Sequence, residues 1–444
     1  MKKFISFVVL HLSSLFRGIY AGKIIGFLDF CREVICGNQT VFAGKVHRRM
    51  DINNIIPSSK ELLEEYPIIE PTNKIKVRIV FPEGDSWNNI HSLYDEFSND
   101  DRFQTYVLIL NENRFVRIMK SVGCRYVITD HYSLKDDKPD ILIACFYGSY
   151  DKNMIFPECR KYIKRFYSFI PSVIMNEMNN DIHWKIIKKG NIYTNPDRYI
   201  VDPLVYNALK GYVENDKLIK MGGCQFDELY NELGKNHVPP QTWDKLQNKI
   251  VYLWATDHGL NESYPKNGFT VDLYLGKMLK YFSEHLDKAL IFRPHPQFIR
   301  EMMRDGHFWS MDDLCKLKSY INSTPNVVWD DSFDFCCAYN VCDALIVDAN
   351  CSIICSFLTT GKPICRLMRE DMKEWLVCPE LYDCYYYAHN FDECIDYINL
   401  VHSGNDPKKL LREDGRHKAI LHFDGSNGVR MKNFIADDYL DYVK

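Results

Sequence analysis

The stretch that decides the fold runs from Ala289 to Arg366, and it begins with ALIFRPHPQ at Ala289–Gln297. Its first residues, Ala289–Phe292, are apolar and predict a short buried strand. The prolines that follow end this strand, because proline has a fixed φ and lacks a backbone donor. Arg293 and His295 are therefore expected at the carboxyl-terminal edge of a sheet.

The same stretch closes with DALIVDANCSIICSFLTTGKPICR, residues 343–366. Ala344–Val347 predicts a strand, and a helix is expected to open at Ser352–Leu358. Gly361 and Pro363 then end the helix before a further strand. The pattern is half of a βαβ unit with polar residues at its strand-to-helix turn, which is where open parallel sheets bind ligands.

The composition of the chain fits a soluble globular protein. Its 444 residues are long enough for two domains, and 46% of them are apolar and 26% charged. The net charge of −4 does not favour binding to nucleic acid. The 16 cysteines show no CxxC pair and no zinc-type spacing, so we expect reduced, buried thiols and a cytoplasmic location.

Residues 1–74 are expected to form an N-terminal helical segment and a linker. The first twenty, MKKFISFVVLHLSSLFRGIY, have apolar side chains near helical spacing and basic residues beside them. Two interpretations stay open: a helix on an anionic membrane surface, at the inner face of the cell membrane, or a helix packed on the next domain. The apolar run Phe4–Leu10 is too short to span a bilayer.

Two domains are expected next, at 75–242 and 243–444. Apolar runs that alternate with helical spacing predict βαβ units and parallel sheets in both. The second domain begins with the strand Lys249–Trp254, and a terminal helix is expected to close it after the turn at His422–Asn427. The predicted fold class is therefore α/β, with two Rossmann-like parallel-sheet domains that face a cleft, N-terminal helices and a C-terminal helix.

The candidate site residues follow strands of the second domain. His258 and His295 are expected on one sheet edge, and with Arg293 they suit an anionic, phosphate-rich substrate. Ser352 adds a hydroxyl at a helix start, where orphan N–H groups also favour anions. Other interpretations stay open, because a histidine after a strand is often structural, and Asn350 and Ser352 would also serve as helix caps.

Motifs for metal or nicotinamide chemistry are missing from the sequence. It contains no D-x-D, H-E-x-x-H, P-loop or GxGxxG. We therefore expect no cofactor and no metal site. The residues alone indicate an α/β enzyme, or a binder, for a phosphorylated ligand.

Five motifs, in this order, resemble the CDP-glycerol glycerophosphotransferase family of teichoic-acid and capsule polymer synthesis: WATDH, FRPHP, NVVWDDSFDF, VCDALIVDANCSIICSFLTTGKPI and HFDGSN. The resemblance covers about Lys76 to the C-terminus. It implies the two-domain GT-B architecture, with the nucleotide held mainly by the second domain. It also implies transfer of glycerol phosphate from CDP-glycerol to a hydroxyl, commonly on a lipid-linked or saccharide acceptor, with release of CMP.

The resemblance also implies roles for individual residues. His258 would be the general base that takes the acceptor proton, a task that suits an imidazole at neutral pH. His295 would hold or protonate phosphate oxygens as CMP departs, and Arg293 would lend charge to the pyrophosphate. Ser352 would bind phosphate at the helix start, and Asp424 would orient groups beside the nucleotide.

The chain departs from the family pattern at the loop before this helix. Aligned backward from Ser352, Cys351 replaces a serine, Asn350 a tyrosine and Ala349 an aspartate, while Asp348 stands one place early. Asn350 remains a candidate substrate-binding residue. The altered loop leaves the donor open: CDP-glycerol, CDP-ribitol, another CDP-activated group or a nucleotide sugar.

Three functions therefore stay open. The first is a CDP-alditol phosphotransferase for capsule or cell-wall polymers. The second is a GT-B glycosyltransferase that uses a nucleotide sugar in surface polysaccharide synthesis, with His258 still the base. Glu370 or Asp371 would then be the ribose ligand, although residues 369–372 have the pattern of a solvated turn. The third is a non-catalytic relative, against which the intact His258, His295 and Asp424 argue.

Overall fold

Short apolar strands form two parallel sheets in the computed structural model, which describes residues 69–81, 87, 89–109, 116, 119–145, 157–170, 196–210, 213–235, 239–257, 268–295, 298–303, 309–332, 335–370, 372 and 379–444. The first sheet has the strand order β3-β2-β1-β4-β5-β6-β7, and the second has β10-β9-β8-β11-β12-β13. The predicted α/β class with two Rossmann-like sheets is confirmed. The predicted N-terminal helix lies outside the described residues.

The strands of the first sheet are β1 (Ile75–Phe81), β2 (Phe103–Ile109), β3 (Tyr126–Ile128), β4 (Ile141–Cys145), β5 (Arg165–Ile170), β6 (Arg198–Val201) and β7 (Leu218–Lys220). Those of the second are β8 (Ile250–Ala255), β9 (Lys288–Arg293), β10 (Val327–Trp329), β11 (Ala344–Asp348), β12 (Ile364–Leu367) and β13 (Tyr386–Ala388). The strand order reverses between β1 and β4 and again between β8 and β11. These two reversal points are where sheets of this type bind ligands.

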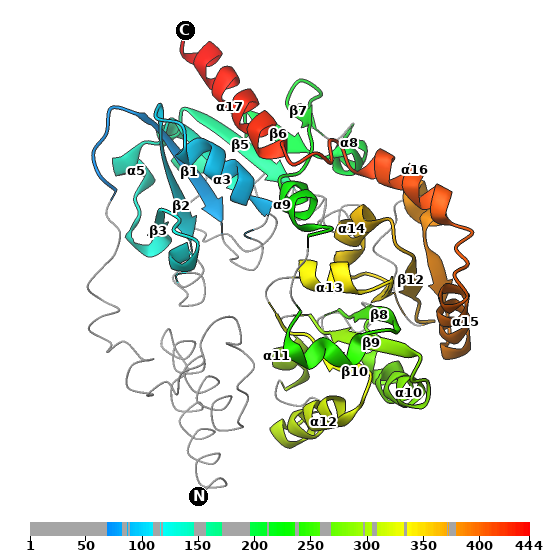
Figure 1. Ribbon diagram of the computed structural model, residues 1–444. Helices are drawn as coiled ribbons and strands as arrows, with labels where there is room; N and C mark the ends of the chain where they lie inside the picture. The colour runs from blue at the N-terminus through cyan, green and yellow to red at the C-terminus, as the bar shows by residue number, and fades with distance from the viewer. Residues whose placement is uncertain are drawn as a thin grey trace, which may run out of the picture.

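Helices cover both faces of each sheet (Figure 1). They are α3 (His91–Ser98), α5 (Leu134–Asp137), α8 (Pro203–Leu209), α9 (Gln225–Glu232), α10 (Val271–Glu284), α11 (Phe298–Met302), α12 (Met311–Ser323), α13 (Cys336–Val341), α14 (Ile353–Phe357), α15 (Phe391–His402), α16 (Lys409–Ala419) and α17 (Asn427–Val443). In the part of the chain that the structure describes, no helix is both long and apolar enough to cross a membrane.

The terminal helix α17 packs on the first sheet, although the sequence places it at the end of the second domain. Met431 and Ile435 are fully buried with the core of β1, β2 and α3. Asp438 accepts hydrogen bonds from Tyr167 Oη at 2.7 Å and from Arg165 Nη2 at 2.8 Å, both on β5. Figure 1 shows the red helix crossing back to lie beside α3 and β5. The chain therefore passes between the two sheets more than once.

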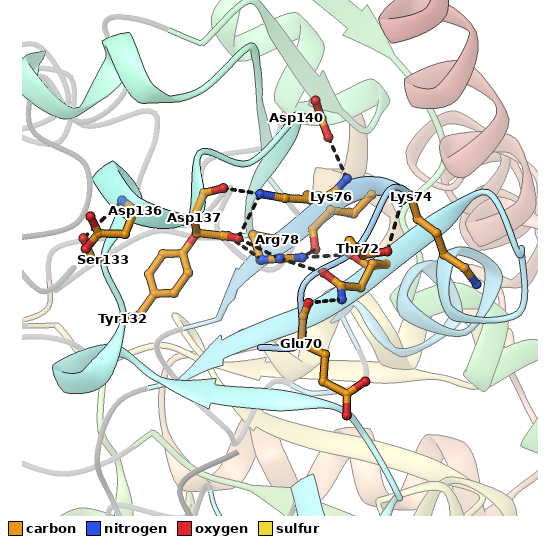
Figure 2. A network of polar contacts seen from close by, with 12 residues as sticks. Glu70, Thr72, Lys74, Lys76, Arg78, Tyr132, Ser133, Asp136, Asp137 and Asp140 are labelled. Carbon is orange, nitrogen blue, oxygen red and sulfur yellow. Dashed lines mark hydrogen bonds and ion pairs between the residues drawn. The ribbon is translucent and has the colours of Figure 1, made fainter. Parts of the chain in front are cut away.

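A buried arginine in β1, a central strand of the first sheet, pairs with an aspartate from another segment (Figure 2). Arg78 lies in the middle of β1 and is fully buried. Its guanidinium donates to both carboxylate oxygens of Asp137, at 2.7 and 3.0 Å, and to the Gln104 carbonyl at 2.8 Å. Tyr132 Oη donates to the same carboxylate at 2.7 Å. A buried charge held in this way is costly to leave without its partner.

Replacing Arg78 with methionine is expected to lower the free energy of unfolding by about 3 kcal/mol, because Asp137 would keep a buried charge without its cation. Denaturant unfolding followed by circular dichroism measures the loss. The double variant Arg78→Met/Asp137→Leu should lose less than the sum of the single variants. Arg102→Met, at the exposed pair with Asp100, should cost under about 1 kcal/mol. Equal losses for Arg78→Met and Arg102→Met would contradict the argument.

Candidate functional site

The candidate site lies at the reversal point of the second sheet, where the carboxyl ends of β8 and β11 meet. The two strands pair in parallel, with Val347 opposite Ala255. Asp257 therefore follows β8 close to Asp348, the last residue of β11, and both side chains are buried. The two aspartates therefore meet at the point where a parallel sheet of this type binds its ligand.

Asp348 ties three segments together at this point. Its carboxylate accepts the N–H of Asp257 at 2.9 Å and the N–H of Thr270 at 3.3 Å, and it also accepts the Thr270 hydroxyl. The end of β8 and the start of α10 are thus held against the end of β11. Burial raises the pKa of Asp348 to about 7, although the Thr270 hydrogen bond opposes this shift.

The raised pKa of Asp348 makes the stability of the fold depend on pH. The folded chain retains this proton between about pH 4 and pH 7 while the unfolded chain releases it, so this group lowers the free energy of unfolding as the pH rises. Between these two pH values, the contribution of Asp348 to the free energy of unfolding falls by up to about 4 kcal/mol. Asp348→Asn should remove it, because an amide satisfies the same partners without titrating.

Urea unfolding of both proteins from pH 4 to pH 8 tests this expectation. Asp343→Asn is the matched control, because Asp343 also accepts a β8 backbone N–H, that of Val251 at 2.8 Å, but at the opposite edge of the sheet and with an exposed side chain. The control should keep the wild-type slope. Parallel stability curves for wild type and Asp348→Asn would refute the expectation.

Arg293 and His295 lie where the sequence predicts, at the end of β9. Arg293 forms an ion pair with Asp330 and donates to the Ser332 carbonyl at 2.9 Å, so the segment after β10 holds its guanidinium. His295 is half-buried two residues further on, and its carbonyl accepts the Phe298 N–H at 2.8 Å at the start of α11. Because β9 is the neighbour of β8, both residues stand one strand from the Asp257–Asp348 contact. His258 directly follows Asp257 in the sequence but lies outside the described residues.

Asn350 and Ser352 lie in the turn between β11 and α14. Ser352 immediately precedes α14, and its side chain makes no capping hydrogen bond, so the alternative that it caps the helix is wrong. Asn350 faces the start of α10: a Cβ on Gly268 would stand 3.5 Å from Asn350 Nδ2. Gly268 has φ +96°, a conformation that favours glycine. The turn is therefore packed against the segment that Asp348 also holds.

The Gly361-Lys362-Pro363 turn after α14 has a structural role. Gly361 takes φ +69°, in the left-handed region, and ends the helical turn. Lys362 Nζ donates to the carbonyls of Tyr339 at 2.6 Å and Cys342 at 2.5 Å. The ammonium thus satisfies carbonyls at the end of α13, where a helix carries partial negative charge.

Asp424 lies at the start of α17, on the side of the first sheet. Its exposed carboxylate accepts from Arg430 Nη1 at 2.8 Å, and this contact holds its pKa below the usual range. Among the described residues, no contact joins Asp424 to the ends of β8, β9 or β11. Its role beside a nucleotide remains a prediction.

The sequence interpretation missed two contributors to this region. Thr270 carries no motif, and its link to Asp348 spans 78 residues. Arg366 lies inside β12, and its guanidinium reaches the Ala349 carbonyl in the β11–α14 turn. In the sequence, the signal is an arginine inside an otherwise apolar strand pattern, because such a residue is seldom buried without a partner.

Comparisons with known proteins agree with this architecture. No family model matches the sequence, and no curated protein matches it either. Among solved structures, the UDP-N-acetylglucosamine 2-epimerase from Rickettsia bellii matches with TM-score 0.55 and 15% identity, over 84% of this chain and 98% of that one. The UDP-GlcNAc 2-epimerase from Neisseria meningitidis bound to UDP-GlcNAc matches with TM-score 0.54 and 12% identity, over 82% of this chain and 100% of that one.

A glycosyltransferase of kitacinnamycin is also similar, with TM-score 0.50 and 10% identity, over 82% of this chain and 99% of that one. At such identities the likeness concerns the fold. The chain therefore has the GT-B architecture, with two Rossmann-like sheets, that it shares with these structures. The finer resemblance to CDP-glycerol glycerophosphotransferases has no counterpart among these matches.

Proposed function

We propose that this chain is a GT-B transferase that binds a nucleotide-activated donor at the carboxyl edge of its second sheet and passes the activated group to a hydroxyl acceptor. The observation that carries the proposal is the convergence of the β8 end and the β11–α14 turn at the strand-order reversal, braced by Asp348. Arg293 ends the adjacent strand β9 and His295 follows it, and their side chains are of the kinds that suit a diphosphate.

A nucleotide sugar is the donor that we place first. Similar UDP-GlcNAc 2-epimerases have been solved with UDP-GlcNAc or UDP bound, and the match covers nearly all of those chains and 82% of this one. In this reaction the acceptor oxygen would bond to the sugar carbon as that carbon's bond to the diphosphate breaks. UDP would leave, and His258 would take the acceptor proton. Charge neutralisation of the departing diphosphate would be the main contribution of the protein.

Glycerol phosphate from CDP-glycerol is the second candidate, supported by the ordered motifs from WATDH to HFDGSN. Here the acceptor oxygen would bond to the phosphorus that bears glycerol, and the bond from that phosphorus to CMP would break. His258 would accept the proton, and His295 would hold or protonate the departing phosphate. The product would extend a capsule or cell-wall polymer, on a lipid-linked or saccharide acceptor.

Release of the nucleotide separates these candidates. The full chain is incubated with UDP-GlcNAc, other UDP-sugars, CDP-glycerol and CDP-ribitol together with hydroxyl acceptors, and UDP and CMP are quantified. UDP release supports the first candidate, and CMP release the second. Tight binding of UDP or CDP by calorimetry without any release would identify a non-catalytic relative. If the chain neither binds nor releases any of these nucleotides, the proposal is refuted.

A further inference from the structure

We propose that Arg366 is a positioning residue that fixes the β11–α14 turn for the diphosphate of the donor; this inference rests on the proposed function. Arg366 lies on β12, opposite Val347 of β11, and its side chain is 1% exposed. Its Nη2 and Nε donate to the Ala349 carbonyl at 2.8 and 3.2 Å. The guanidinium thus reaches past the end of β11 into the turn that follows.

The aromatic side chains of β13 and the residue before it hold the guanidinium in this position. Its central carbon lies 5.5 Å from the ring centre of Tyr387 and 6.0 Å from that of Tyr385. Cation–π attraction at such distances stabilises a buried guanidinium, and Tyr385 itself is buried. A planar guanidinium with two donors on one oxygen restricts the peptide plane more than a single contact would.

The contact matters because a carbonyl repels an anion. At a strand end that receives a diphosphate, the partial negative charge of Ala349 O would oppose binding if that oxygen faced the ligand. Arg366 donates to this oxygen, and in the planar trans peptide the N–H of Asn350 points away from it. On the other face of β11, Asp348 braces the same strand end through Asp257. The turn is therefore held from both faces of the sheet.

The second domain offers a matched control for a buried arginine. Arg412 on α16 is also fully buried, donates to a backbone carbonyl, that of Gly361 at 2.9 Å, and forms an ion pair with Asp406. Gly361 precedes β12, so this contact lies at the amino edge of the strand, away from the β11–α14 turn. Loss of Arg412 should therefore affect stability and leave ligand binding unchanged.

The test compares diphosphates with nucleosides. Calorimetry measures the affinities of wild type, Arg366→Met, Arg366→Lys and Arg412→Met for UDP and uridine, and for CDP and cytidine. Arg366→Met should weaken the preferred diphosphate by about tenfold, the scale of a hydrogen bond to a charged group, and leave its nucleoside within about twofold. Arg366→Lys should recover part of the loss, and Arg412→Met should keep the wild-type ratio of diphosphate to nucleoside affinity.

Each outcome has a distinct meaning. If wild type binds neither UDP nor CDP, the proposed function is refuted, and this inference with it. If wild type binds a diphosphate and Arg366→Met binds it equally well, or loses nucleoside and diphosphate affinity to the same extent, the inference alone is overturned. Should the methionine variant not fold, Arg366→Lys must show a selective loss of diphosphate affinity, and an unchanged ratio in that variant overturns the inference.

Discussion

Replacing His295 with alanine is expected to lower donor turnover by about two to four orders of magnitude, the usual contribution of a positioned acid or base. His295 follows β9 at the sheet edge where β8 and β11 also end, so this residue lies one strand from the reversal point. There it would hold or protonate the departing phosphate. His258→Ala should cause a loss of the same order, because the acceptor hydroxyl would lack its base.

The matched control is another histidine beside the same strand. His285 precedes β9, stacks on Tyr281 at 4.1 Å between ring centres and shares a 2.7 Å hydrogen bond with the Tyr281 carbonyl. Because it lies at the opposite edge of the sheet, His285→Ala should keep wild-type turnover. Release of UDP or CMP is the measurement, with circular dichroism to confirm folding. Undiminished turnover in both His258→Ala and His295→Ala would exclude the assigned roles.

Replacing Asp227 with alanine is expected to lower the free energy of unfolding by about 4 to 5 kcal/mol. Asp227 lies on α9, is 2% exposed and accepts the N–H groups of Asn427 and Gly428 at 2.8 and 2.7 Å. It also accepts the Ser92 hydroxyl of α3 at 2.9 Å. One carboxylate thus caps α17 and joins three helices, and its loss would leave several buried donors unsatisfied.

The close approach of α3 and α17 prevents the helices from repacking to compensate for the loss of the Asp227 carboxylate. A Cβ on Gly428 would stand 2.7 Å from the Ser92 backbone, so α17 and α3 have no room to repack around a cavity. Asp227→Asn should give an intermediate loss, because one acceptor becomes a donor. Asp424→Ala, at the exposed ion pair beside the same helix start, should cost under about 1 kcal/mol. Similar losses for Asp227→Ala and Asp424→Ala in denaturant unfolding would disprove the capping argument.

The strands were predictable because nearly all of their residues are buried. The predicted strands Lys249–Trp254, Ala289–Phe292 and Ala344–Val347 agree with β8, β9 and β11 to within one residue at each end. A strand covered by helices on both faces is apolar along its whole length, and such runs are visible without any other part of the chain. The prolines after β9 likewise marked the strand end that carries Arg293 and His295.

The contacts that hold the candidate site were not predictable from local pattern. Asp348 meets Thr270 only when β8 and β11 become neighbours, and Arg366 meets Ala349 only when β12 joins them. Such pairings depend on strand order, which periodicity does not encode. Periodicity is equally silent about the packing of α17: its amphipathic pattern predicts a helix, but it does not indicate which sheet the helix covers.

The place of α17 has a consequence for how the chain is made. Synthesis begins at the N-terminus, and domains often fold as they leave the ribosome. The first sheet, however, needs Met431, Ile435 and Tyr439 to cover one of its faces. Its core therefore stays incomplete until α17 has been translated, and a nascent chain stopped after residue 242 would expose apolar surface to the cell's chaperones.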